Sequence, residues 1–146
     1  MNKKWVDFFI DDARFWAEKS KDPRKKVGCV IIDSDFGQLS SGYNGFARGV
    51  TDTDRRLGRK EIKNSFTIHA EANAVANAAR LGHSLKGSIA FVTFPCCSGC
   101  ANLLAQSGVR EVYMPTPKKD SSWCYSNQIA LVIFNESGVK VNYTDV

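Results

Sequence analysis

Short apolar segments typical of β-strands alternate along this chain with segments of helical spacing. The clearest strand is predicted over 27–32, Val27-Gly28-Cys29-Val30-Ile31-Ile32, because an unbroken apolar run of this length is typical of a buried strand. Strands that alternate with helices indicate layered packing, so we expect an α/β sandwich. Further strands are predicted over 39–43, 89–94, 109–114 and 139–143, and helices over 4–18, 69–81, 97–107 and 123–135.

Residues 44–65 differ from the rest of the chain, because they are rich in charge and glycine and have no clean hydrophobic period. We expect no regular secondary structure there, and a connection of that length is usually functional or disordered. The final helix, over 123–135, is the least clear element, since 129–134 is also strand-like. A helix followed by a strand nevertheless gives the better topology.

Length and composition suit a single domain over residues 1–146. Of the 146 residues, 43% are hydrophobic and 24% are charged, as in an ordinary globular protein. No apolar run approaches the roughly 20 residues that a membrane-spanning helix needs. Asp7 interrupts the apolar residues near the start, so we expect no signal peptide and a cytoplasmic location.

Five cysteines are present, and this odd number argues against a closed set of disulfides. Cys96, Cys97 and Cys100 lie close together in the sequence. In a reducing compartment such a cluster indicates a metal site or a catalytic site.

Two short motifs supply a set of zinc ligands. His69-Ala70-Glu71 stands at the start of one predicted helix, and Cys97 and Cys100 stand at the start of another. Zinc accepts one imidazole and two thiolates, and three protein ligands leave a position for water, as in catalytic sites. Helix N-termini also favour the thiolate form of cysteine. We therefore expect one catalytic Zn²⁺ bound by His69, Cys97 and Cys100.

Glu71 is the expected catalytic residue. It follows His69 by two residues, about 200° around an ideal helix, and so should not bind the same ion. A carboxylate there can still take a proton from a water and pass it to a leaving group. The His-x-Glu and Cys-x-x-Cys motifs together match the zinc deaminase signature.

Other interpretations of the cysteines stay open. Pro95 is followed by both Cys96 and Cys97, so either of them could pair with Cys100; two intervening residues is the commoner zinc spacing, and we choose Cys97. A structural zinc site would need a fourth ligand, for which Cys96 and Cys124 are available. A thioredoxin-like redox dithiol would not need the His-Ala-Glu motif.

These motifs and others along most of the chain resemble the deoxycytidylate (dCMP) deaminase family within the cytidine deaminase superfold. Cys96 departs from the family pattern, which has proline there, and so does Ala47, where proline is frequent. The resemblance implies a three-layer α-β-α sandwich around a central mixed five-stranded sheet. The matching segments are Ser20-Lys21-Asp22-Pro23, Lys26-Val27-Gly28, Gly42-Tyr43-Asn44-Gly45-Phe46, His69-Ala70-Glu71-Ala72-Asn73-Ala74, the cysteine motif and Gln106-Ser107-Gly108-Val109.

By this resemblance we expect a hydrolase of a cyclic amidine C–N bond, which converts dCMP to dUMP and ammonia and so supplies dUMP for dTMP synthesis. A zinc-activated water would attack C4, and Glu71 would carry the proton to N3 and then to the departing amine. Ala70 would offer its backbone N–H to the cytosine O2, and Asn44 would hydrogen-bond the deoxyribose. Trp123 falls where relatives place an aromatic near the base, although it could equally anchor the last helix in the core.

The resemblance also implies partners. Family members are commonly homo-oligomers, often hexamers, and some are activated by dCTP and inhibited by dTTP. Mg²⁺ is expected only if such a triphosphate effector binds. Residues 44–65 are where we expect such control.

The basic residues are concentrated in two segments. The whole chain has a net charge of +5, of which residues 19–26 carry +4 and residues 48–63 carry +3. Both flank the hairpin that ends at Asn44, whereas a polynucleotide binder usually spreads its charge along a face, so we do not expect a polynucleotide partner. We expect one small phosphate held by one or two charge-assisted donors, with Arg24 and Arg48 as candidates. The alternative is a solvated basic face.

Two other functions stay open. Another deaminase of the superfold, acting on a free nucleoside, a riboflavin precursor or a base in tRNA, would share the zinc motifs but is disfavoured by Ser20-Lys21-Asp22-Pro23 and Gly42-Tyr43-Asn44-Gly45. A zinc-containing nucleic-acid-binding module without catalysis would explain the charge but would leave Glu71 unexplained. Strong salt-dependent affinity for polynucleotide would support it.

Overall fold

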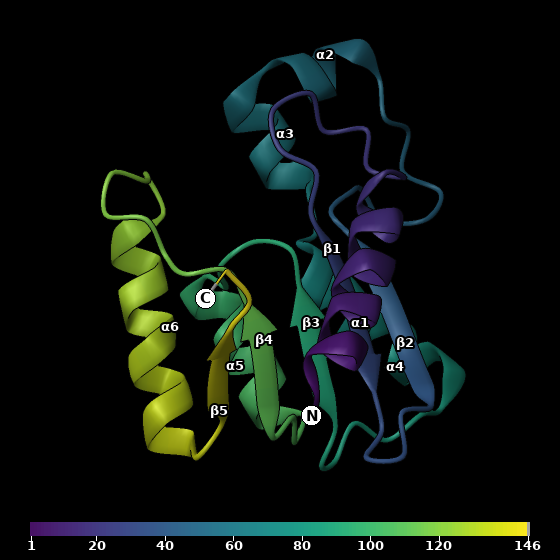
Figure 1. Cartoon of the computed structure of the whole chain (residues 1–146). Coiled ribbons are helices and arrows are strands. Elements are labelled where there is room, and N and C mark those ends of the chain that lie inside the picture. The colour runs from purple at the N-terminus through teal and green to yellow at the C-terminus, as the bar shows by residue number, and fades with distance from the viewer. Residues whose placement is uncertain (146) are drawn as a thin grey trace.

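The computed structural model describes residues 1–145, whose strands form one five-stranded sheet (Figure 1). The strands are β1 (Gly28–Ile32), β2 (Gln38–Tyr43), β3 (Ile89–Val92), β4 (Glu111–Met114) and β5 (Lys140–Tyr143). Their order across the sheet is β2-β1-β3-β4-β5. Strand β1 is antiparallel to β2 and β3, whereas β4 is parallel to β3 and β5. The expected mixed five-stranded sheet is therefore confirmed.

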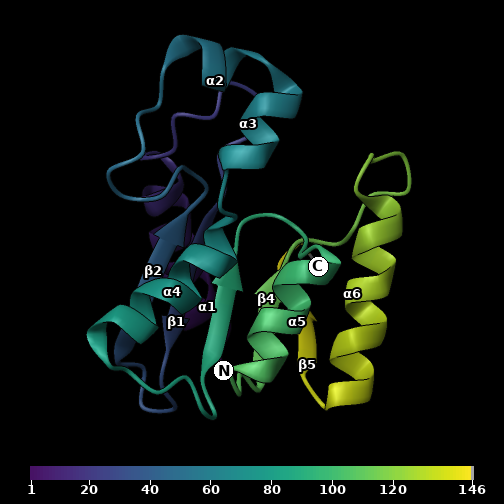
Figure 2. The same ribbon diagram turned by 180° about the vertical axis from the view of Figure 1, so that it is seen from behind.

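Helices cover both faces of this sheet and make three layers. The helices that pack on it are α1 (Lys3–Ala17), α4 (Ala70–Leu81), α5 (Ser98–Gln106) and α6 (Cys124–Ser137). Helix α1 lies on one face (Figure 1), and the other three lie on the opposite face (Figure 2). In β1, Val30 and Ile32 pack towards α1, whereas Cys29 and Ile31 join the core on the other side. Because both of its faces are buried, β1 is apolar throughout, and the expected α-β-α sandwich is confirmed.

Two glycines let helices approach the sheet closely. A Cβ atom at Gly28 in β1 would overlap the carbonyl oxygen of Ala13 in α1. A Cβ atom at Gly42 in β2 would overlap the carbonyl oxygen of Ala70, the first residue of α4. Since neighbouring backbone cannot move aside as a flexible side chain can, any larger residue would push these helices outwards. Gly42 therefore fixes how closely the start of α4 lies to the sheet.

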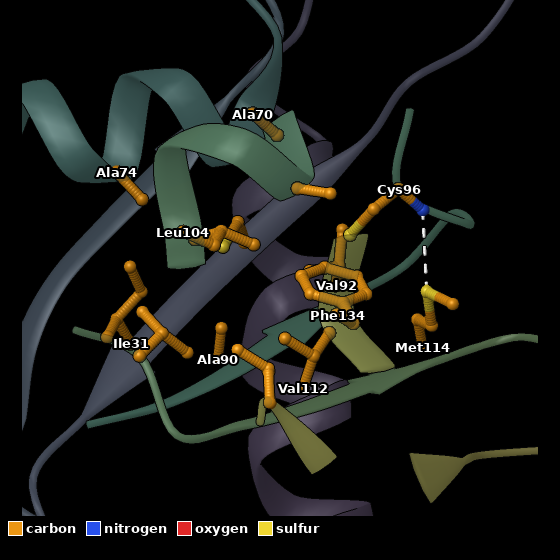
Figure 3. Close-up of a cluster of buried hydrophobic side chains, with 14 of the residues drawn as sticks. Ile31, Ala70, Ala74, Ala90, Val92, Cys96, Leu104, Val112, Met114 and Phe134 are labelled. Atoms are coloured by element: carbon orange, nitrogen blue, oxygen red, sulfur yellow. Dashed lines mark hydrogen bonds between the residues drawn. The ribbon is translucent and has the colours of Figure 1, made fainter. Parts of the chain in front are cut away.

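The core beneath α4, α5 and α6 contains mostly small and branched side chains and includes Cys96 (Figure 3). Cys96 is fully buried, and its backbone N–H donates to Sδ of Met114 at 3.4 Å. Ala74 of α4 and Leu104 of α5 lie in the same core. The residue that departs from the family's proline is therefore a core residue at the end of the loop between β3 and α5.

Residues 44–65 were expected to lack regular structure, and that prediction is wrong. They contain α2 (Asp54–Gly58) and most of α3 (Lys60–Phe66), which stand beyond the end of the sheet where α4 begins (Figures 1 and 2). Thr53 caps α2 with its side chain. The buried residue of α3 is Lys63, so hydrophobic spacing carries no signal of this helix.

The other predicted elements are present, with small shifts at their ends. Helix α4 starts one residue after His69 and α5 one residue after Cys97, because these two residues are the N-caps. The helix predicted over 123–135 corresponds to α6. Among residues 1–145, no helix is both long and apolar enough to cross a membrane.

Candidate active site

The three predicted zinc ligands lie together at the N-termini of α4 and α5. Nδ1 of His69 is 3.4 Å from Sγ of Cys97 and 3.5 Å from Sγ of Cys100. All three donor atoms lie within 4.8 Å of one another. Tetrahedral zinc, with bonds of about 2.1–2.3 Å, holds its ligand atoms roughly 3.5–3.8 Å apart, so this donor set fits Zn²⁺.

Helix capping explains why the ligands converge. His69 and Cys97 both have extended backbone at N-cap positions, and Sγ of Cys97 accepts the N–H of Cys100 at 3.4 Å. Side chains in a helix point back towards its N-terminus, so Cys100 in the first turn of α5 returns to the same place. The positive ends of two helix dipoles therefore face the sulfur atoms and favour thiolate.

Helix α6 holds the cysteine loop from the other side. Oγ of Ser126 accepts the N–H of Ser98 at 2.9 Å. Nδ2 of Asn127 donates to the carbonyl oxygens of Cys96 at 2.8 Å and Pro95 at 3.2 Å. Because Asn127 is buried, water does not compete for these bonds. The backbone leading into Cys97 is thus fixed by hydrogen bonds from a distant helix.

The two cysteine ligands are electrostatically unequal. The hydrogen bond from the Cys100 thiol lowers the pKa of Cys97, burial opposes it, and His69 adds to the lowering. The hydrogen bond to Cys97 raises the pKa of Cys100, and burial raises it further. The two sulfur atoms thus share one proton, and metal binding must release it.

Cys96 does not belong to the ligand cluster, although it precedes Cys97. Burial raises the pKa of the Cys96 thiol well above its usual range, and the charge of Glu71 raises it further. The sulfur of Cys96 is not among the donor atoms that gather around His69, whereas those of Cys97 and Cys100 are. Cys124 also lies outside the cluster. Within residues 1–145 the geometry favours the Cys97 and Cys100 pair and brings no fourth protein ligand to it.

Glu71 is buried and lines the same cavity as His69 and Cys97. Only 4% of the residue is exposed, and this burial raises the pKa of its carboxyl group. A raised pKa suits a carboxyl group that must both accept and donate a proton near neutral pH. Glu71 therefore has the position and the acidity of a general acid-base.

A cavity of about 400 Å³ opens beside these residues. Its volume lies within the range of small-molecule sites. Trp123 forms part of the wall, and its ring meets the ring of His69 edge-on with centroids 5.5 Å apart. Since 40% of Trp123 is exposed, it is not a core anchor of α6. An aromatic surface is therefore available beside the metal ligands.

Cationic side chains from two segments also line the cavity. Arg24 and Lys25 come from the loop between α1 and β1, and Lys60 and Lys63 come from α3. Nζ of Lys25 lies 5.0 Å from the centroid of the Phe94 ring, within the range of a cation-π contact. Asp22, which also lines the cavity, offsets the charge of Lys63, so the excess positive charge comes from Arg24, Lys25 and Lys60. The cavity thus combines the predicted zinc ligands with a basic wall, an arrangement that suits a small anionic ligand.

Arg48 does not line this cavity. Its Nη2 atom donates to Oδ1 of Asn77 in α4 at 2.8 Å. It lines a separate hollow over β2 and α4. Of the two arginines predicted to hold a phosphate, the structure therefore brings Arg24 to the metal centre and not Arg48.

Asn44 and Ala70 also line the cavity. Oδ1 of Asn44 accepts the N–H of Val27, and its Nδ2 donates to the carbonyl oxygen of Lys25, both at 2.8 Å. One lone pair of Oδ1 remains for a ligand. Ala70 is the first residue of α4, so its N–H has no carbonyl partner within the helix. The contacts expected of Asn44 with deoxyribose and of Ala70 with cytosine stay predictions.

Several residues at the cavity are not found by sequence reasoning. Lys60, Lys63 and Asn64 reach it from α3, in a segment expected to be irregular. The spacing of four between Lys60 and Asn64 is the signal that would have placed them on one helix face. Ser126 and Asn127 carry no signal of their own, because their partners lie about 30 residues earlier in the chain.

The chain is similar in sequence to a family of known proteins. The family model described as the cytidine and deoxycytidylate deaminase zinc-binding region matches residues 3–116. A protein of Aliivibrio fischeri, the uncharacterized deaminase in the luxG 3' region, is 36% identical over 148 residues, which cover 98% of this chain and 95% of that protein. Human deoxycytidylate deaminase is 32% identical over 141 residues, which cover 93% of this chain and 77% of the human protein.

A solved structure has the same fold. The crystal structure of dCMP deaminase from the cyanophage S-TIM5 in apo form superposes with a TM-score of 0.78 and 26% sequence identity. The match covers 98% of this chain and 99% of the cyanophage chain. The same cyanophage enzyme has also been crystallised in complex with dCMP and dUMP.

The choice between Cys96 and Cys97 predicts different zinc contents for two serine variants. Cys97→Ser is expected to lose bound zinc and activity, because it removes one of the three donor atoms. Cys96→Ser is expected to keep most of both and to lose about 1–3 kcal/mol of stability, since it buries a hydroxyl in the core. Metal analysis, deamination rate and thermal unfolding measure the three effects. Zinc lost from Cys96→Ser but kept by Cys97→Ser would reverse the assignment.

Proposed function

Because the chain belongs to the cytidine and deoxycytidylate deaminase family, we propose that it is a zinc-dependent hydrolase that converts dCMP to dUMP and ammonia. One observation carries the choice of substrate: the cavity that holds the metal ligands and Glu71 also has a wall of cationic side chains. A mononucleotide matches both features, because its base can react at the metal ligands and Glu71 while its phosphate binds to the cationic wall. The reaction belongs to pyrimidine nucleotide metabolism and provides dUMP for dTMP synthesis.

The zinc ligands would be His69, Cys97 and Cys100, whose spacing fits the ion. When bound, zinc supplies a water whose pKa is lowered towards neutrality. Glu71 takes a proton from the attacking water and delivers it to N3 of cytosine, and then passes a second proton to the amine. The water oxygen forms the new bond to C4, the C4–N bond breaks, and ammonia leaves. A buried carboxyl group with a raised pKa suits both transfers.

The base would lie in the cavity beside the zinc ligands, with the indole of Trp123 as one wall. The edge-to-face contact of Trp123 with His69 supports this placement, because it puts the aromatic surface next to a zinc ligand. The free N–H of Ala70 at the start of α4 is available to cytosine O2. The remaining lone pair on Oδ1 of Asn44 is available to the deoxyribose.

The phosphate would be held at the basic wall. Arg24 is the best-supported phosphate ligand, since the sequence predicts this role and the residue lines the cavity. Lys25 and Lys60 line the same cavity and can add charge-assisted hydrogen bonds. Arg48 would need a different role, because it is bonded to Asn77 outside the cavity.

Several wider properties belong to the same proposal. The chain would act as a single deaminase domain over residues 1–146, which is supported by a family match that starts at residue 3 and by the single sheet of residues 1–145. A cytoplasmic location follows from a substrate of nucleotide metabolism. Control by dCTP and dTTP, with Mg²⁺ accompanying the triphosphate, rests on family resemblance alone.

A homo-oligomer, with a hexamer favoured, is supported by exposed apolar side chains on two helices. Phe15 on α1 is 72% exposed, and Tyr125 on α6 is 81% exposed. Phe8 and Val132 add to the same two helices. Exposed apolar side chains mark a contact between proteins where they form a contiguous patch.

The proposed reaction predicts ammonia release from dCMP in preference to other cytosine compounds. Purified protein would be incubated separately with dCMP, deoxycytidine, dCTP and a cytosine-containing oligonucleotide. Activity on the oligonucleotide alone would contradict the proposal, and tight salt-sensitive oligonucleotide binding without any deamination would point to a nucleic-acid-binding module.

Glu71→Gln serves as the matching active-site variant in the same assay. It is expected to keep zinc but to lose about 10²–10⁴-fold in rate, because the amide cannot carry the proton. Glu136→Gln, at an exposed position of α6, is the control and should keep full activity.

Because only Arg24 lines the cavity, we expect Arg24→Ala and Arg48→Ala to differ in their KM for dCMP. Arg24→Ala is expected to raise the KM for dCMP about tenfold, since it removes a charge-assisted phosphate contact, and to leave kcat little changed. Arg48→Ala, which removes an arginine outside the cavity, should leave both parameters near wild type. Steady-state kinetics measures both. An unchanged KM in Arg24→Ala would exclude Arg24 from phosphate binding.

Light scattering of the purified protein tests the oligomer. A hexamer has a mass of six times the 16.2 kDa chain, about 97 kDa. A monomeric mass at assay concentration would contradict the proposed homo-oligomer.

A further inference from the structure

Two sequence motifs that the zinc chemistry does not explain form one buried hydrogen-bond network. Oγ of Ser20 donates to the carbonyl oxygen of Asn44 at 2.8 Å and accepts the N–H of Asp22 at 3.2 Å. Ser20 and Asp22 belong to the Ser-Lys-Asp-Pro motif, and Asn44 belongs to the Gly-Tyr-Asn-Gly motif. The network therefore ties the loop after α1 to the end of β2.

The charged centre of this network is a pair formed by Asp22 and Lys63. Nζ of Lys63 lies 2.7 Å from Oδ2 of Asp22, and each side chain is only 8% exposed. Burial raises the pKa of Asp22, but the hydrogen bond from Lys63 and two backbone N–H groups outweigh it, so the carboxyl group is held ionised. Burying two charges costs more than burying two apolar side chains of similar size. Stability of α3 alone is therefore a poor explanation for this pair.

The second oxygen of Asp22 shapes the loop that carries the cavity cations. Oδ1 of Asp22 accepts the backbone N–H of Arg24 at 2.8 Å and of Lys25 at 3.1 Å. Nδ2 of Asn44 holds the carbonyl oxygen of Lys25 at 2.8 Å. These bonds fix the backbone from which Arg24 and Lys25 enter the cavity.

Lys63 fixes the other cation-bearing segment. It lies on α3 between Lys60 and Asn64, which both line the cavity. Helix α3 stands beyond the end of the sheet (Figure 1). Lys63 is its buried residue. The bond to Asp22 therefore joins α3 to the loop after α1 directly above the cavity.

We infer that the Asp22–Lys63 pair is a positioning device that holds these two segments together and thereby sets the affinity of the cavity for the 5'-phosphate of the substrate. This inference rests on the proposed deamination of dCMP. Neither residue is assigned to the chemical step, so their loss acts on the binding of the phosphate and leaves proton transfer at Glu71 in place.

The same loop offers a matched control. Lys21 and Asp52 form an ion pair of the same length, 2.7 Å, but their side chains are 68% and 38% exposed. Exposed pairs contribute little to structure, because water and salt screen them. Lys21→Met therefore removes a neighbouring lysine from an ion pair without opening the buried network.

The test compares Asp22→Asn, Lys63→Met, their combination and Lys63→Arg with wild type and Lys21→Met. Asp22→Asn and Lys63→Met are each expected to raise the KM for dCMP about tenfold while kcat stays within about twofold. The double variant should be no worse than either single variant, since both remove one interaction. Lys63→Arg, which keeps the charge, should recover part of the loss, and Lys21→Met should behave as wild type.

Two further measurements separate positioning from general damage. Zinc content of each variant should stay close to wild type. Asp22→Asn and Lys63→Met should lower the unfolding temperature, because each leaves a buried charge without its partner, but both should remain folded at the assay temperature. The kcat/KM for deoxycytidine, which lacks the phosphate, should not change in Asp22→Asn. If Lys63→Met does not fold, Asp22→Asn and Lys63→Arg carry the test, because asparagine matches aspartate in size and arginine keeps the buried positive charge.

Each contrary result has a distinct meaning. An unchanged or lower KM for dCMP in Asp22→Asn would overturn the inference, and a lower KM would show that Lys63 binds the phosphate directly. An equal loss on dCMP and deoxycytidine would overturn it in favour of a purely structural role. A wild type without activity on dCMP would overturn the proposed function and this inference with it.

Discussion

The site depends on the meeting of two helix N-termini at one end of the sheet. Helix α4 is held against β2 by the close approach at Gly42, and α5 starts directly after β3. The partial positive charges of both helix ends act on the small volume that contains Cys97, Cys100 and Glu71. Three acidic groups in one buried place would otherwise repel one another strongly. The helix ends offset part of this repulsion, and a divalent cation offsets the rest.

The residues proposed for the reaction and those proposed for phosphate binding stand on segments that are stabilised by different kinds of interaction. The zinc ligands and Glu71 stand on helices packed against the apolar core, where any displacement costs cavity formation or overpacking. The cations at the basic wall stand on a loop and on α3, which are held chiefly by hydrogen bonds and a charge pair. Polar contacts on a loop can change without disturbing the core, so this arrangement would let the proposed phosphate recognition vary while the proposed chemistry is kept.

The sequence predicts those parts of the structure that follow from local pattern. Strand β1 is apolar throughout because both of its faces are buried, and the predicted metal ligands belong to two short motifs at helix starts. Helix α3 could not be predicted from hydrophobic spacing, because its buried residue is the charged Lys63. The partner that makes this burial possible, Asp22, lies 41 residues earlier in the chain. The sequence could not distinguish Arg48 from Arg24 for a similar reason. Both are arginines in basic segments, and only the tertiary fold puts them in different cavities.

Asn127 stands in the last helix, yet it holds the backbone of the loop that carries Cys97. During synthesis, His69 and both cysteine ligands therefore leave the ribosome well before the residue that completes their support. Until α6 docks, the carbonyl groups of Pro95 and Cys96 lack these bonds, and the loop can sample other conformations. The backbone that leads into Cys97 is thus fully held only when the last helix is in place, so the loop is completed together with the whole fold.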